Sequence, residues 1–136
     1  MKLFLDTNIL IDVVANRQPW VDDALVLLEL ANQKKLTLMA ADYSFINIAY
    51  ITRKLFPTED LRLLLKDLRK YVEVVDIGAD VIDKVLNDNW KDFEDCVQYY
   101  TALSKNADVI ITRNKRDFVS SDIQVFSPRE FLTYYL

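Results

Sequence analysis

Short, mainly apolar runs alternate along the chain with longer segments that show helical spacing of apolar residues. The runs cover residues 3–5, 36–40, 71–75, 109–111 and 123–126, with polar residues between them. Runs of this length are typical of buried strands, and apolar positions three and four residues apart predict helices between them. The pattern therefore predicts an α/β fold with a mostly parallel sheet covered by helices on both faces.

Three of the predicted helices have distinctive patterns. The helix from Tyr43 to about Leu55 is apolar nearly all round, which indicates a deeply packed helix. The helix that begins near Pro57 has an apolar stripe and a charged, solvated face. Ser127-Pro128-Arg129-Glu130 combines an N-cap serine, a proline at the first helical position and an acid three residues after the cap. This segment predicts the start of the closing helix.

Composition is that of one soluble domain over residues 1–136, with 51% apolar and 28% charged residues. No apolar run approaches the about 18 residues of a membrane span, so no membrane partner is expected. The single cysteine, Cys96, cannot form an internal disulfide, and it favours a reducing, cytoplasmic setting.

Three counts exclude whole classes of function. The chain has no histidine, which removes most triad, general-base and zinc sites. Its single glycine, Gly78, argues against any glycine loop that cradles phosphate. A net charge of −4 gives no overall attraction for nucleic acid, so such a partner needs a local basic patch or a bound cation. The 21 acidic residues leave open a site for a hard cation such as Mg²⁺ or Mn²⁺.

Two predicted strands end in the same kind of polar sequence. The first run is followed by Asp6-Thr7-Asn8, and the fourth by Thr112-Arg113-Asn114 with Asp117 shortly after. If these strands are neighbours, Asp6 and Asp117 converge at the carboxyl edge of the sheet, where open α/β sheets bind ligands. Asp6 is then a candidate metal ligand. The structural alternatives are that Asp6 or Thr7 caps the next helix, and that Asp117 is a solvated acid.

A helix predicted to open at Asp92 carries two more candidate acids. At about 100° per residue, Asp92 and Asp95 fall on the packed side, whereas Glu94 falls with Gln98 and Thr101 on the side expected to meet solvent. Two acids that lean toward a core require compensation of their charge, which a divalent cation would provide. The structural alternative for Asp92 is the N-cap of this helix.

The motifs at residues 5–8, 92–95 and 112–118 resemble, in their order and separation, those of PIN domains in the branch that includes VapC-type toxins. The resemblance covers all 136 residues. It implies a three-layer α/β/α PIN-like fold with a central five-stranded, mostly parallel sheet. It also implies a metal-dependent endoribonuclease that hydrolyses RNA phosphodiesters as the toxin of a toxin–antitoxin pair. An antitoxin protein and a second copy of the chain are the protein partners it suggests.

The same resemblance assigns roles to individual residues. The catalytic acids it implies are Asp6, Asp95 and Asp117. The candidate ligands of Mg²⁺ or Mn²⁺ are Asp6, Asp92, Asp95 and Asp117. The supporting polar residues are Thr7, Asn47, Thr112 and Asn114. The basic side chains expected to contact RNA are Arg113, Lys115 and Arg116, for which the structural alternative is a solvated loop.

One position departs from the family pattern. PIN domains commonly carry another acid after the second strand, within a Ser-x-x-Glu-like stretch. Here Ser44-Phe45-Ile46-Asn47 has an amide instead, which supplies no negative charge. Asp92 is expected to compensate in part, and the alternative for Asn47 is a structural amide.

Two other classes of function stay open at this stage. Haloacid-dehalogenase-like hydrolases would use Asp6 covalently, but they require Asp-x-Asp, and Asn8 occupies the second position here. The stronger rival is a catalytically weak or inactive PIN-like module that binds RNA or a protein, which the departure at Asn47 favours.

Overall fold

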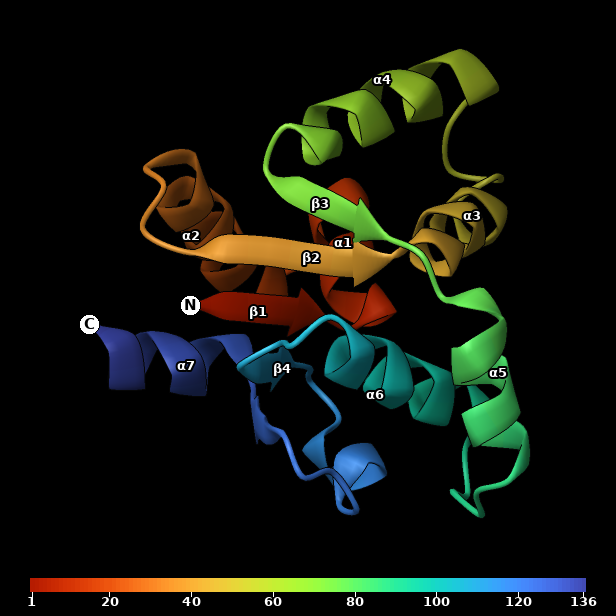
Figure 1. Cartoon of the computed structure of the whole chain (residues 1–136). Helices are drawn as coiled ribbons and strands as arrows, with labels where there is room; N and C mark the ends of the chain where they lie inside the picture. The colour runs from red at the N-terminus through yellow and green to blue at the C-terminus, as the bar shows by residue number, and fades with distance from the viewer.

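A computed structural model describes residues 1–136 and shows a central sheet with helices on both faces (Figure 1). The strands are β1 (Lys2–Leu5), β2 (Thr37–Ala41), β3 (Val72–Val75), β4 (Val109–Ile111) and β5 (Gln124–Phe126). The helices are α1 (Thr7–Val14), α2 (Trp20–Asn32), α3 (Asp42–Ile51), α4 (Thr58–Arg69), α5 (Gly78–Leu86), α6 (Phe93–Ser104), the 3₁₀ helix η1 (Lys115–Phe118) and α7 (Pro128–Tyr135). None of these helices combines the length and apolar character needed to cross a bilayer.

The sheet has the order β3-β2-β1-β4-β5, and every neighbouring pair is parallel. Leu3 pairs with Val109 and Leu5 with Ile111, so β1 lies in the centre beside β4. The Asp6 N–H continues this pairing by donating to the carbonyl of Ile111 at 2.9 Å. The predicted α/β class and the predicted adjacency of the first and fourth runs are confirmed. The sheet is entirely rather than mostly parallel.

Side chains that alternate along β1 enter two separate cores. Leu3 and Leu5 belong to the larger core, which includes residues of α1, α2, α3, α4 and α7. Phe4 points to the other face and packs in a smaller core with Met39 and Tyr99. Because successive residues of a strand face opposite sides, a strand buried on both faces has the continuous apolar run seen here. The sheet is therefore the middle of three layers, with one core between it and the helices on each face.

The prediction of a deeply packed helix after β2 is wrong. Only Ser44 and Ile48 of α3 are buried, whereas Ile46 is 69% and Tyr50 63% exposed. The helix contacts α1 and β2 and leaves its opposite side uncovered. Helix α3 therefore presents an apolar face on the surface. The apolar pattern of its sequence alone does not distinguish such a face from a buried one.

The closing helix begins as predicted. The Ser127 hydroxyl accepts a hydrogen bond from the Glu130 N–H at 3.1 Å, and the Glu130 carboxylate accepts one from the Ser127 N–H at 3.0 Å. This reciprocal capping satisfies two backbone donors at the start of α7.

Candidate active site

An acid-lined cavity of about 290 Å³ lies at the carboxyl ends of β1 and β4, beside the start of α6. Its lining residues are Asp6, Thr7, Asn8, Ile11, Asn47, Ile51, Asp92, Glu94, Asp95, Asn114 and Asp117. The structure thus brings the four predicted acids to one cavity, although they come from both ends of the chain. It adds a fifth acid, Glu94, that the helical pattern placed toward solvent.

Asp6 is the most buried of these acids, with 4% of its surface exposed. One carboxylate oxygen, Oδ1, accepts a hydrogen bond from Gln98 Nε2 at 2.7 Å. The other, Oδ2, accepts one from the Thr112 hydroxyl at 2.7 Å. Burial raises the pKa of Asp6, and the hydrogen bonds from Thr112 and Gln98 oppose that rise. Two neutral donors therefore fix the carboxylate, and no cation neutralises it.

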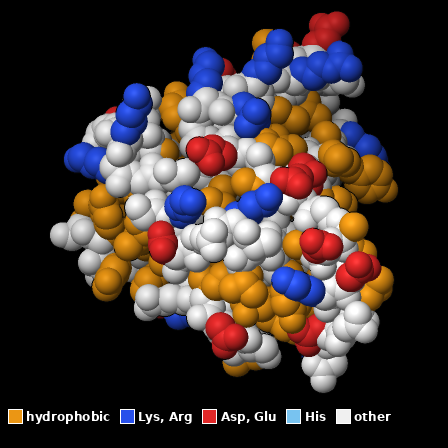
Figure 2. Space-filling model, in the orientation of Figure 1, with side chains coloured by type: hydrophobic (Ala, Val, Ile, Leu, Met, Phe, Trp, Pro, Cys, Tyr) orange, Lys and Arg blue, Asp and Glu red, His pale blue; other side chains and the backbone are white.

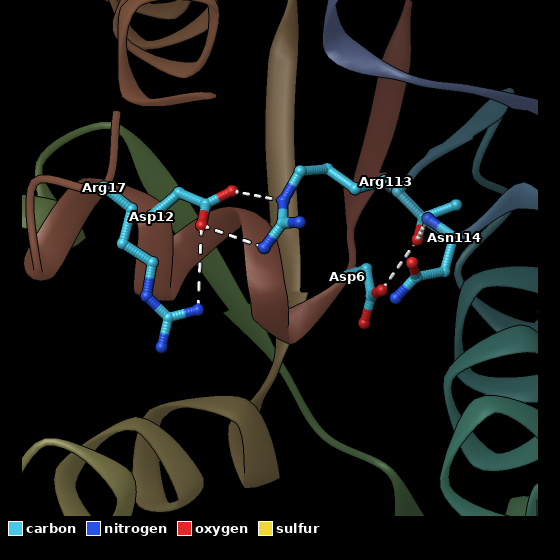
Figure 3. A network of polar contacts seen from close by, with 6 residues as sticks. Asp6, Asp12, Arg17, Arg113 and Asn114 are labelled. Carbon is cyan, nitrogen blue, oxygen red and sulfur yellow. Dashed lines mark hydrogen bonds and ion pairs between the residues drawn. The ribbon is translucent and has the colours of Figure 1, made fainter. Parts of the chain in front are cut away.

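The partners of Asp6 are themselves held in place. Gln98 Oε1 accepts a hydrogen bond from the Thr7 N–H at 3.3 Å, and the Thr112 hydroxyl accepts one from the Asn114 N–H at 3.1 Å. Figure 3 shows Asn114 beside Asp6 at the end of this chain of contacts. The Thr7 hydroxyl is hydrogen-bonded to the buried Ser44 hydroxyl at 2.7 Å. The supporting polar residues thus link β1, β4, α3 and α6.

The capping alternatives have different outcomes for Asp6 and Asp92. Asp6 precedes α1, but its side chain makes no capping hydrogen bond. Asp92 does cap α6, because its Oδ1 accepts from the Asp95 N–H at 2.9 Å. Asp92 therefore has a structural role while it also lines the cavity.

The remaining acids raise one another's proton affinity. Partial burial and the nearby charges of Asp6, Asp92, Asp117 and Glu94 raise the pKa of Asp95 to about 7. Burial and the charges of Asp92 and Asp6 likewise raise the pKa of Glu94. No acid that lines the cavity forms an ion pair with Lys or Arg. The cavity is therefore a concentration of uncompensated negative charge.

Two residues of α6 were misplaced by the helical pattern. Gln98 is 3% exposed and Thr101 fully buried, although their face of α6 was expected to meet solvent. Helix α6 packs against α5 on one side and lies over the sheet and η1 on the others, so this face is covered. A sequence signal does exist: Glu94 and Gln98 are four residues apart, which sets both on the side that meets the end of β1.

Asn47, the position that departs from the family pattern, lines the cavity and is partly buried. Its Nδ2 donates to Glu94 Oε1 at 3.3 Å. The amide thus contacts a carboxylate from another element, which supplies the negative charge that Asn47 lacks. The acid that contacts Asn47 is Glu94, whereas the sequence pointed to Asp92 as the compensating acid.

The basic residues near Asp117 do not form a free cluster. Arg113 donates to both oxygens of Asp12 at 2.7 and 3.1 Å, and its guanidinium lies 4.0 Å from the centre of the Trp20 ring. Lys115 pairs with Glu130 at 2.9 Å, and with Ser127 it lowers the pKa of Glu130 to about 2. Arg116 is exposed and has no acidic partner. Of the three side chains predicted to contact RNA, only Arg116 lacks an acidic partner, and the assignment of all three to RNA stays a prediction.

A metal fits the chemistry of this cavity but is not held by its present geometry. The lining oxygens of carboxylates and amides are the ligands that Mg²⁺ and Mn²⁺ prefer, and their unbalanced charge favours a cation. No group of three or more Asp, Glu, His or Cys side chains converges closely enough to hold one ion. The metal-ligand assignments therefore stay predictions.

The family model of the PIN domain matches residues 2–116. The chain belongs to the PIN domain family. Ribonuclease VapC1 of Aquifex aeolicus (strain VF5) is a relative of this PIN domain. The two sequences are 25% identical over an alignment of 138 residues in length, which covers 96% of this chain and 92% of that protein.

Solved structures share the PIN fold with this chain. VapBC2 from Rickettsia felis, bound to a DNA fragment from its promoter, is 18% identical with a TM-score of 0.70, over 93% of this chain and 98% of that one. A toxin–antitoxin complex from Klebsiella pneumoniae is 22% identical with a TM-score of 0.68, over 93% and 97% of the two chains. At these identities the likeness establishes the fold, and it confirms the predicted PIN-like architecture.

Proposed function

We propose that this PIN domain is an endoribonuclease that depends on Mg²⁺ or Mn²⁺ and acts as the toxin of a toxin–antitoxin pair. The observation that carries the proposal is Asp6, a buried carboxylate held by two neutral donors that faces further acids with no cation to balance them. The similarity to a relative named Ribonuclease VapC1 supports the same chemistry.

In this proposal Asp6, Asp95 and Asp117 hold the divalent cation, with Asp92 and Glu94 beside them. When bound, such a cation polarises water and stabilises the charge that develops on a phosphodiester. Gln98 and Thr112 prevent the Asp6 carboxylate from rotating, because each holds one of its two oxygens. Asn114 supports the same carboxylate through Thr112.

Two basic side chains near the acid-lined cavity are available to bind the RNA backbone. A second cavity of about 430 Å³ shares Asp92 and Asp117 with the acid-lined cavity and is also lined by Lys91 and Arg116. Phosphate recognition by Lys and Arg is local and sensitive to salt, which suits a protein with a net charge of −4. We therefore assign backbone contacts to Arg116 and Lys91, and a structural role to Arg113.

An antitoxin protein is the proposed partner of the exposed apolar face on α3 and α4. Figure 2 shows hydrophobic side chains gathered where α3 lies in Figure 1. The exposed apolar side chains of this region are Ile46, Tyr50 and Ile51 on α3, Leu55 just after it and Leu63 on α4, all at least 42% exposed. Contiguous apolar surface of this kind is typical of protein interfaces.

The test is an assay on labelled single-stranded RNA with Mg²⁺, with Mn²⁺ and with chelator. Wild type is expected to cleave only with metal, and Asp6→Asn is expected to be inactive. Asp80→Asn is the matched control, because Asp80 is exposed on α5 away from the cavity. Cleavage that persists in chelator or in Asp6→Asn contradicts the proposal.

The rival function is a PIN module that binds RNA or protein without cleaving it. It is favoured by Asn47 in the place of an acid and by the lack of three converging acidic side chains. Absence of cleavage above the chelated control, with every metal tried, would establish this function instead.

A further inference from the structure

An apolar cavity adjoins the acid-lined one. Its volume is about 460 Å³, and its lining residues are Ala41, Tyr43, Ile77, Ile82, Phe93, Glu94, Val97 and Gln98. Two aromatic side chains line it while remaining open to solvent, with Phe93 56% and Tyr43 42% exposed. Aromatic surface left open in a cavity binds flat apolar groups well.

The two cavities are neighbours that share one wall residue. Both are lined by Glu94, and Gln98 of the apolar cavity holds the carboxylate of Asp6. Phe93 lies between Asp92 and Glu94 in the sequence, so its ring is carried by the same turn of α6 that carries two of the acids. Whatever binds at the acids therefore has this aromatic surface beside it.

We propose that the apolar cavity is a subsite for one unpaired nucleobase of the RNA substrate, stacked against Phe93. The proposal rests on the proposed nuclease function and adds the position of a base to it. In a single strand each phosphate is flanked by bases, and aromatic side chains beside a backbone-binding groove stack such bases. A base in a duplex is paired and stacked and is not free to enter, so the subsite selects single-stranded RNA.

The polar groups of the cavity favour a base that carries an exocyclic amino group. Glu94 accepts one hydrogen bond, from Asn47, and its second carboxylate oxygen makes none. A carboxylate accepts hydrogen bonds and donates none when ionised, and it pairs well with the N4 amino group of cytosine. Uracil presents a carbonyl at the same place, which Glu94 would repel. The subsite therefore prefers cytosine to uracil.

The first experiment measures KM for cleavage of labelled single-stranded RNA by wild type and variants. Phe93→Ala is expected to raise KM about ten-fold, because it removes the aromatic surface on which one base stacks. Phe93→Tyr keeps the ring and is expected to keep KM. Tyr134→Ala is the matched control, since Tyr134 is 66% exposed on α7 and lines neither cavity.

The second arm changes the RNA. A set of RNAs each carries one abasic nucleotide at a different position. At a single position near the cut, the missing base is expected to raise KM for wild type but not for Phe93→Ala. Replacing cytosine by uracil at that position is expected to raise KM less. Equal KM values for wild type and Phe93→Ala, or equal sensitivity of both proteins to every abasic position, overturn the proposal while the nuclease function stands.

The third arm separates the subsite from the nuclease function. Cytidine, which has no phosphate, is titrated into metal-free protein and followed by NMR. Shifts are expected at the backbone amides of Tyr43 and Phe93, and they are expected to disappear in Phe93→Ala. If no RNA is cleaved with any metal, this titration decides alone. Shifts at these amides support a base-binding site on an inactive module. No shift at these amides overturns the proposal and is the result expected if the cavity instead binds a side chain of a protein partner.

Discussion

Asp6 and Asp12 are two buried aspartates on one short segment, and they meet opposite surroundings. Asp12 is 1% exposed, accepts two hydrogen bonds from Arg113 and has Arg17 at 3.9 Å. Asp6 is 4% exposed and accepts hydrogen bonds only from the neutral groups of Gln98 and Thr112. Figure 3 shows both carboxylates, with Arg113 extended toward Asp12 and away from Asp6.

The difference distinguishes an acid whose charge is compensated from one whose charge is not. A buried charge is tolerated when an opposite charge and hydrogen bonds compensate it, as at Asp12. The neighbours of Asp6 are further acids, which make its charge more costly. Burial alone would have ranked the two aspartates as equals, whereas the sign of the neighbouring charge distinguishes them.

The largest effect is expected at the structural pair. Asp12→Ala leaves the partly buried Arg113 guanidinium without its partner, and it is expected to lower the free energy of unfolding by about 3 kcal/mol. Urea denaturation measures this loss. The double variant Asp12→Leu with Arg113→Met is expected to recover part of the loss, because it removes both charges. A single variant within about 0.5 kcal/mol of wild type would show that the pair is dispensable.

Asp6→Asn is the counterpart at the acid to which a catalytic role is proposed. It is expected to abolish cleavage, since it removes a charged ligand from the proposed site. The free energy of unfolding in chelator is expected to stay the same or rise, because repulsion between acids is relieved. A loss of stability as large as that of Asp12→Ala would mean that Asp6 is structural too.

Asp95 gives the comparison a pH dependence. Partial burial and neighbouring acids raise its pKa to about 7, so the folded protein binds a proton there that the unfolded chain releases above about pH 4. Folded-state proton binding stabilises at low pH, so metal-free stability is expected to fall as the pH rises from about 4 to about 7. The free energy of unfolding, measured by urea denaturation at several pH values, is expected to change less with pH in Asp95→Asn than in wild type. An equal dependence on pH in the two proteins would show that Asp95 ionises normally.

The smallest effect is expected at Asn47. Asn47→Asp adds a carboxylate where Asn47 now donates to Glu94, so a cation gains one charged neighbour. The Mn²⁺ concentration needed for half the maximal cleavage rate is expected to fall a few-fold. Asn47→Ser, which adds no charge, is the control. A higher metal requirement in the aspartate variant would show that the amide–carboxylate contact is what matters.

Sequence patterns predicted the features that depend on neighbouring residues along the chain. A buried run followed at once by polar residues identified β1 and β4, and the repeated motif placed Asp6 and Asp117 at one edge. The cap at Asp92 and the capping box at Ser127 are also local and were correctly predicted.

The patterns failed where another element decides the outcome. Gln98 is buried because the sheet and α5 cover α6. Arg113 forms an ion pair with Asp12, which lies 101 residues earlier in the chain and is not a local neighbour in the sequence. The exposed face of α3 has an apolar sequence like that of a core helix, and only its position in the fold distinguishes the two. The metal ligands and the extent of residues 1–136 as a single domain stay predictions.

The central position of β1 has a consequence for when the site comes into being. Asp6 is made early in synthesis, but its partner Thr112 directly follows β4, whose pairing with β1 closes a loop of about one hundred residues. Closing long loops and forming distant strand pairs are slow steps of folding. A growing chain that has not reached Thr112 holds Asp6 without one of its two donors and lacks Asp117 altogether. Under the proposed function, cleavage is therefore expected only after synthesis has passed residue 117.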